Sequence, residues 1–249
     1  MTKTKLLGGI LFFVAVTAVV LFGSTIGATQ LEADSGPKTA TIAGLRYTYW
    51  IVPEKDGSYT ILSDYALATS AEIQAAINAM DRIGETFASG DSPFEAEIVF
   101  AHPLSVVEFR AFAQSAKIAP INNVLRGIDS SGQVAEMHAP PVWAKDANGR
   151  LLVGKPVVGG DPLDASALDR FATGHHQIRT VGVVTTDVML DAQTYAQVRK
   201  DPRVYVVDVM RQVLINAVHS AYPGAPNAKI DVVNPALYAA LEKARNVLR

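Results

Sequence analysis

The hydrophobic positions of this chain begin with one unbroken run and then recur with the periods of helices and strands. The run Leu6–Ala28 holds 23 residues without a charge. At ~1.5 Å per residue it is long enough to cross a hydrocarbon layer of ~30 Å as a helix. Lysines precede it and acidic residues follow it, so we expect the N-terminus in the cytoplasm and residues 29–249 outside.

The length of the run favours an uncleaved signal-anchor, because the apolar region of a signal peptide usually holds ~7–15 residues. The sequence Ile26-Gly27-Ala28 ends in a small residue, so secretion after cleavage near Ala28 is the alternative. Residues 1–28 are therefore predicted to be a signal-anchor or signal peptide. Residues 29–40 are polar with a Gly-Pro and are predicted to be a stalk, and residues 41–249 an extracytoplasmic domain.

Beyond the stalk, the pattern predicts a hairpin and a helix. Tyr47–Val52 and Tyr59–Leu62 are aromatic and β-branched and are separated by an Asp-Gly turn, as in a β-hairpin. Thr69 and Glu72 form a capping box for a helix over Thr69–Phe87. Its buried stripe is expected to comprise Ile73, Ile77, Met80, Ile83 and Phe87.

Two strand–helix–strand units follow. In the first, Glu95–Phe100 alternates as a half-buried strand, a helix with the capping box Ser105 and Glu108 follows, and Ile121–Ile128 returns as a strand. In the second, Ile178–Thr185 is the strand, Asp191 caps the helix, and Val204–Val209 returns after an Asp-Pro stop.

Between the two units, residues 130–177 break the rhythm and are interpreted as an insertion. They contain a predicted hairpin over Val142–Val153, turning at Asn148-Gly149, and a short helix over Asp164–Ala172. At the C-terminal end we expect a helix over Val213–Tyr222, a short strand over Lys229–Val233, and a last helix capped by Asn234.

The fold class is therefore predicted to be α+β. An N-terminal transmembrane or signal helix precedes a hairpin and helix, and the two units form a ferredoxin-like βαββαβ sandwich. The inserted hairpin and the extra C-terminal helices complete the prediction.

The segment Gly182–Asp208 resembles the second half of the subtilisin propeptide-like inhibitor family. The shared features are a strand with a glycine, a helix with an apolar or aromatic contact, an Asp-Pro turn and a strand ending in an acidic residue. They fall here on Gly182, Leu190, Tyr195, Val198, Asp201-Pro202-Arg203-Val204 and Val207-Asp208. The resemblance implies a ferredoxin-like fold. In that family the segment after the final strand lies in the protease cleft, whereas here a helix is expected directly after Val209.

Composition and charge narrow the possible partners. There is no cysteine, so lipoprotein attachment, disulfides and thiolate metal sites are excluded. The net charge is −2 with both signs interspersed, which argues against a nucleic-acid surface. No phosphate-binding glycine loop or common hydrolase motif is present, and we predict no cofactor, metal-binding or catalytic residues.

Several polar residues are candidates for catalysis or metal binding, but the sequence favours a structural role for each. His175-His176 lack the spacing of metal ligands, and His138 and Asp161 could join them only if the insertion folds over. Gly90-Asp91-Ser92 is similar to the Gly-Asp-Ser of some secreted hydrolases, but a helix-terminating turn explains these residues together with Pro93. The aromatic residues Tyr47, Tyr49, Trp50 and Trp143 are predicted to lie in the core or on a partner surface. Asp187, Asp191 and Asp208 are predicted to be turn or cap residues. Asn122 and Asn123 form a pair for which the sequence shows no matching acid or base.

These observations favour a non-catalytic, membrane-anchored module of the cell envelope. It would bind an envelope or extracellular protein through its insertion or through an exposed sheet edge. A peptidase-inhibitor-like or chaperone-like module is the alternative that the resemblance suggests. A secreted hydrolase, or an enzyme using His138, His175 or His176, is the third.

Overall fold

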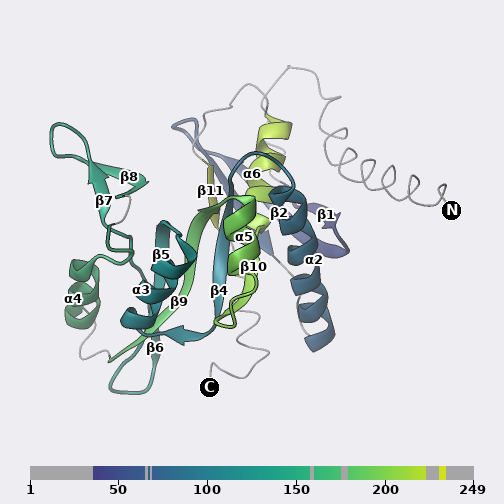
Figure 1. Ribbon diagram of the computed structural model, residues 1–249. Coiled ribbons are helices and arrows are strands. Elements are labelled where there is room, and N and C mark those ends of the chain that lie inside the picture. Colours follow the sequence, from purple (N-terminus) through teal and green to yellow (C-terminus); the bar gives the residue numbers. More distant parts are fainter. Residues whose placement is uncertain are drawn as a thin grey trace, which may run out of the picture. The chain divides into compact units, whose positions relative to one another are not determined.

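The computed structural model is a mixed α and β structure (Figure 1). Its described elements group into two compact units, one made of residues 36–79 and 210–233 and the other of residues 80–209. The boundary falls within one helix, so each unit is described by itself. The structure describes residues 36–64, 67, 69–157, 160–174, 179–222 and 230–233.

The first unit is built on a four-stranded sheet of order β1-β2-β3-β11. β1 (Lys38–Ile42), β2 (Leu45–Pro53) and β3 (Tyr59–Asp64) are antiparallel neighbours, and β11 (Ile230–Val233) runs parallel to β3. One face of the sheet is apolar and buried, with Leu45, Tyr47, Ile51, Tyr59 and Ile61. Helix α6 (Met210–Ala221) contacts β11, and Tyr222 beyond it stacks on Tyr59 with 4.8 Å between ring centroids.

The second unit contains an entirely antiparallel five-stranded sheet of order β10-β4-β9-β5-β6. Its strands are β4 (Phe94–Leu104), β5 (Pro120–Ile128), β6 (Val134–His138), β9 (Arg179–Leu190) and β10 (Val204–Asp208). Helix α3 (Val106–Ala116) connects β4 to β5, and α5 (Ala192–Val198) connects β9 to β10. The two helices contact each other and lie on the same side of the sheet (Figure 1).

The core of the second unit lies between this sheet and its helices. Phe100 of β4 meets Phe109 and Phe112 of α3 edge to face, and all three rings are buried. At the other end, the ring of Tyr195 lies against Gly84 in the second half of α2 (Ser70–Ala88). The Tyr195 hydroxyl donates to the carbonyl of Asp81 at 3.1 Å, and burial raises the pKa of Tyr195 to about 12.

The local signals in the sequence are confirmed. Thr69 and Glu72 form their capping box, with the Thr69 amide donating to the Glu72 carboxylate at 2.8 Å and the Glu72 amide to the Thr69 hydroxyl at 3.2 Å. Ser105 and Glu108 form the second box, and Asp191 caps α5 by accepting from the Thr194 amide at 2.7 Å. In the predicted stripe of α2, Ile73, Met80 and Ile83 are buried, whereas Ile77 and Phe87 are half-buried.

The sequence also predicted the insertion's hairpin and its short helix. They are β7 (Trp143–Lys145) with β8 (Leu151–Pro156), and α4 (Ala165–Gly174). Two strands were not predicted, β1 and β6, and β9 extends five residues beyond the expected Thr185. The expected last helix after Asn234, and the predicted membrane run Leu6–Ala28, lie outside the described residues.

Across the part of the chain that the structure describes, no helix combines the length and the apolar character needed to span a membrane. The α+β class is confirmed. The predicted division into residues 1–28, 29–40 and 41–249 stays a prediction.

Candidate functional site

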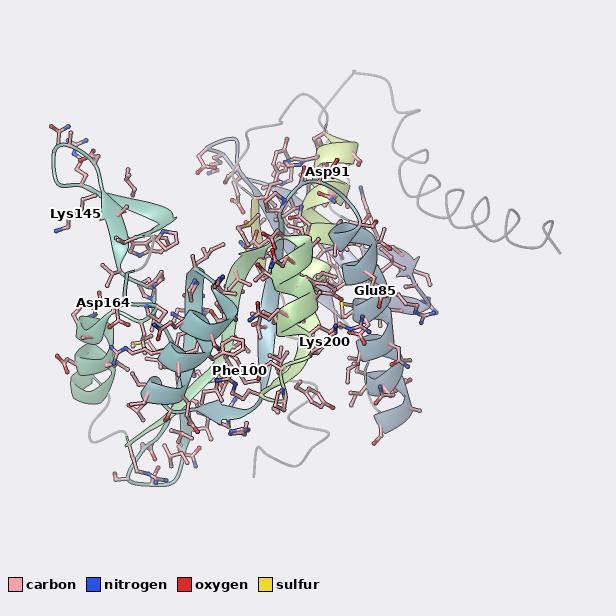
Figure 2. The ribbon with its side chains drawn as sticks, viewed as in Figure 1. Glu85, Asp91, Phe100, Lys145, Asp164 and Lys200 are labelled. Atoms are coloured by element: carbon pink, nitrogen blue, oxygen red, sulfur yellow. The ribbon has the colours of Figure 1, made fainter. Side chains whose placement is uncertain are left out.

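The insertion between β5 and β9 presents a hairpin away from the five-stranded sheet, and we call residues 142–157 the arm. The arm contains β7 and β8, which pair with each other and, among the described residues, with no other strand. Lys145 is labelled on this hairpin, which extends away from the five-stranded sheet (Figure 2). β8 contacts β5, and the hairpin turn is closed by hydrogen bonds from Asp146 to Arg150 and from Gly149 to Asp146.

The arm leaves the sheet through a short, well-bonded segment that we call the root, residues 139–141 and 160–164. Two main-chain hydrogen bonds join the outgoing and returning segments here. The Asp164 amide donates to the Pro140 carbonyl at 3.2 Å, and the Val142 amide donates to the Asp161 carbonyl at 3.2 Å. Ala139 and Leu163 are fully buried. The root is therefore a packed part of the second unit.

Asn123 of β5 connects the two segments of the root. Its side chain is fully buried, and its amide nitrogen donates to the carbonyls of Ala139 at 2.8 Å and Pro162 at 2.9 Å. Its amide oxygen accepts from the Thr186 hydroxyl at 2.8 Å. A buried amide is stable only when its polar atoms are paired, so this residue fixes the position of the root against β5 and β9.

A salt bridge holds the root from the helical side. The Arg110 guanidinium of α3 donates to both carboxylate oxygens of Asp161, at 2.9 and 2.6 Å. The Asp161 carboxylate also accepts from the Leu163 amide at 3.1 Å. Partial burial of Asp161 opposes its ionisation, but the bonds from Arg110 and Leu163 outweigh that effect and lower the pKa of this carboxyl.

The surface of the arm is basic and partly apolar. It carries the exposed Lys145 and Arg150 beside one half-buried acid, Asp146, whereas the whole chain has a net charge of −2. Lys145 and Arg150 are exposed, and so are the large apolar side chains of Val142 and Val157 near the root. This combination suits a partner surface that is acidic and has apolar area of its own.

A chain of polar side chains lies beside the root on the other face of the sheet. The Asn122 amide nitrogen is 2.9 Å from Nδ1 of His138 and 3.3 Å from a carboxylate oxygen of Asp187. An ionised carboxylate only accepts hydrogen bonds, so Asp187 orients the Asn122 amide with its nitrogen towards both neighbours. In the tautomer that accepts this bond at Nδ1, His138 carries its proton on Nε2.

The same face bears three carboxylates in register on neighbouring strands. Glu97 lies opposite Asp208 on one side and Asp187 on the other, and Asp187 lies opposite Asn122. Despite this row, the described residues contain no group of three or more acidic or histidine side chains placed to hold a metal ion.

Several readings of single residues need correction. Asn122 and Asn123 were expected to have no matching acid or base, yet Asn122 contacts His138 and Asp187, and Asn123 holds the root. Asp187 was assigned to a turn or cap, but it lies inside β9 because that strand runs to Leu190. His138 is in β6, Asp161 is in the root, and His175-His176 lie outside the described residues.

Other readings are confirmed, with the exception of Asp208. Asp191 is a helix cap, whereas Asp208 is the buried last residue of strand β10 and not a turn or cap residue. Ser92 lies in the turn between α2 and β4, where the helix-terminating turn was expected, next to Asp91 (Figure 2). Tyr47 is a core residue at 2% exposure, whereas Trp50 and Trp143 are half-buried.

Sequence reasoning missed β6 and therefore the polar chain that it completes. The signal was present in the alternation of Val134, Glu136 and His138 after Asp129-Ser130-Ser131-Gly132, which forms the turn from β5. The predicted insertion, residues 130–177, therefore included residues 134–138 as irregular chain, although they form β6.

No protein-family model, curated protein or solved structure matches this chain.

Proposed function

We propose that this protein is a non-catalytic binding module of the cell envelope, tethered by Leu6–Ala28, and that the arm is a docking surface for another protein. The observation that carries the proposal is an exposed basic hairpin whose root is held by Asn123 and by the Arg110–Asp161 pair. A rigid base under a projecting hairpin restricts its orientations, which lowers the entropic cost of binding.

The physical need for a partner supports the same function. A two-stranded hairpin by itself is marginally stable in water, and β7 has three residues. Contact with a second protein would cover Val142 and Val157 and pair the basic side chains with acids. The binding partner is accordingly an envelope or extracellular protein with an acidic surface.

For the second unit we propose a ferredoxin-like βαββαβ scaffold. The order β10-β4-β9-β5 with neighbouring strands antiparallel supports it, as does the use of α3 and α5 as the two helical connections. In this proposal the scaffold has a structural role, and β6, the arm and α4 are additions between its two halves.

The test is site-specific photo-crosslinking of the full-length protein in its own cells. A photoreactive residue at Ala147, in the exposed turn of the arm, should give a discrete adduct with one envelope protein. The double variant Lys145→Glu and Arg150→Glu should reduce that adduct at least about tenfold, which corresponds to ~1.4 kcal/mol.

Lys200 provides the matched control because it is an exposed lysine on α5's side of the same unit (Figure 2). Lys200→Glu should leave the adduct unchanged, and a photoreactive residue at position 200 should not form it. Equal adducts from positions 147 and 200, or an adduct insensitive to the arm's charge, would rule the arm out as the docking surface.

Peptidase inhibition stays a prediction of the resemblance, and the described contacts do not favour it. Helix α6 begins at Met210, two residues after β10 ends, where the inhibitor family has the segment that enters the protease cleft.

A further inference from the structure

The outer edge of β6 presents main-chain hydrogen-bonding groups in a defined register. Asn123 and Ala139 exchange both main-chain hydrogen bonds, at 3.1 and 2.7 Å, and the Asp129 amide donates to the Gln133 carbonyl at 2.9 Å. Bonded and non-bonded pairs alternate in an antiparallel ladder. The amides and carbonyls of Val134, Glu136 and His138 therefore point away from β5, whereas those of Ala135 and Met137 point towards it.

β6 lacks three of the features that protect an edge strand, namely lysine, proline and a bulge. Lysine, proline and bulges discourage a further strand from pairing with such an edge. The sequence of β6 is Val-Ala-Glu-Met-His, and its pairing with β5 has no register shift. The opposite edge strand of the same sheet, β10, carries a register shift between Val204 and Val206.

The side chains of β6 on the same face as Asn122 determine which residues a partner strand would need opposite them. Val134 is 42% exposed and would lie opposite an apolar residue. Glu136 pairs with the buried Arg126 but keeps a half-exposed carboxylate, which suits a lysine or arginine opposite it. His138 is exposed and, with Nδ1 at Asn122, offers its Nε2–H to a hydrogen-bond acceptor.

We infer that β6 is a strand-addition site for an extended segment of a partner protein, which pairs antiparallel to it. The segment carries a hydrogen-bond acceptor, a basic residue and an apolar residue at alternate positions, opposite His138, Glu136 and Val134 in that order. The inference rests on the proposed function as a protein-binding module and adds a second surface with its own sequence preference. Main-chain bonds supply affinity, and the alternate side chains supply specificity.

The test uses a synthetic seven-residue peptide with the pattern Ser-Thr-Thr-Lys-Thr-Val-Ser and the full-length protein in detergent micelles. Residue-resolved hydrogen exchange should show that millimolar peptide slows exchange of the Val134, Glu136 and His138 amides. The Ala135 and Met137 amides already donate to β5 and should change little. A peptide with glutamate in place of lysine should bind at least about tenfold more weakly.

Two variants separate the edge from the fold. Val134→Pro removes an outward amide without breaking a bond to β5 and should weaken peptide binding at least about tenfold, while Glu136→Gln should abolish the preference for lysine over glutamate. If exchange at Val134 and His138 does not slow in the unmodified protein, the strand-addition site is refuted, whatever the variants do.

The outcome is distinguishable from that of the arm experiment. Loss of the Ala147 crosslink in the Lys145→Glu and Arg150→Glu variant with peptide binding retained would support both surfaces as independent. A retained crosslink and no peptide effect on exchange would overturn the β6 site and leave the arm as the docking surface.

Discussion

Gly182 occupies a position in β9 that other residues cannot take without strain. Its φ is +155°, and a Cβ there would overlap the carbonyl oxygen of Leu104, in the strand alongside. The register between β4 and β9 shifts at this point, where Leu104 pairs with Val183. The glycine at position 182 thus has a local explanation, which is the close approach of two main chains.

We predict that Gly182→Ala destabilises the protein by about 2–4 kcal/mol, because it adds both backbone strain and a clash with main-chain atoms. The measurement is the free energy of unfolding in urea. Gly132→Ala is the control, since Gly132 also has a positive φ of +84° but no atom within 4 Å of a Cβ. Its cost should be about 1–2 kcal/mol, that of the left-handed conformation, and equal costs for the two variants would contradict the role of the close approach.

Among the elements, the arm is held at its root by two polar contacts. Its root is held by Asn123 inside the sheet and by Asp161 on the helical side, and only the second contact can be titrated. The pKa of Asp161 is lowered from the usual 3.8 in the folded state. Its stabilising effect is therefore fully present above pH ~4 and is lost as the pH falls through the lower folded-state value.

We predict that acid loosens the root of the arm before the rest of the fold. In a Trp50→Phe background, the fluorescence of Trp143 should change as the pH falls below ~4. Asp161→Asn should already show the changed signal at pH 7 and respond less to acid. The stability difference should be below about 1 kcal/mol, because Asp161 is 36% exposed and the pair is screened by water.

Asp129→Asn is the matched control for this titration. The pKa of Asp129 is also lowered, by hydrogen bonds from the Ser131 side chain and nearby amides, but this residue lies in the β5–β6 turn. Its replacement should leave the acid response of Trp143 intact. If both variants changed that response equally, the Arg110–Asp161 pair would not be its cause.

For the whole molecule, the predicted membrane tether is the main basis of the proposed function. Leu6–Ala28 has the length of a membrane span, and the sequence has no cysteine for a disulfide or a cysteine-linked lipid. The domain must therefore be stabilised by packing, as the cores of its two units indicate.

We predict that the protein sediments with membranes and resists extraction by alkaline carbonate, which removes peripheral proteins. Its intact mass should correspond to a chain that retains residues 1–28, because the apolar run is longer than a typical signal peptide. Replacement of Val16 and Val19 by lysine should release the protein from membranes, since charges inside such a run oppose insertion. A mature chain beginning near Thr29 would contradict the anchor and establish secretion.

Much of the fold could be predicted from local patterns. The capping boxes at Thr69 and Ser105 and the cap at Asp191 specify helix starts through contacts that span three residues. Asn148-Gly149 predicted the hairpin turn of the arm, because Gly149 supplies the positive φ of +77° that the turn requires. Such interactions close within a few residues, so the sequence alone determined them, together with the α+β class.

The candidate surfaces depended on contacts between distant residues. Asn122 meets His138 across 16 positions and Asp187 across 65, and Arg110 meets Asp161 across 51. The periodicity of a helix or a strand does not predict contacts between residues so far apart in the sequence. The strand order β9-β5-β6 brings Asn122, His138 and Asp187 together. The sequence determined which segments form helices and strands, and only the tertiary structure decided which side chains share a face, because a sheet aligns residues by strand pairing and not by separation along the chain.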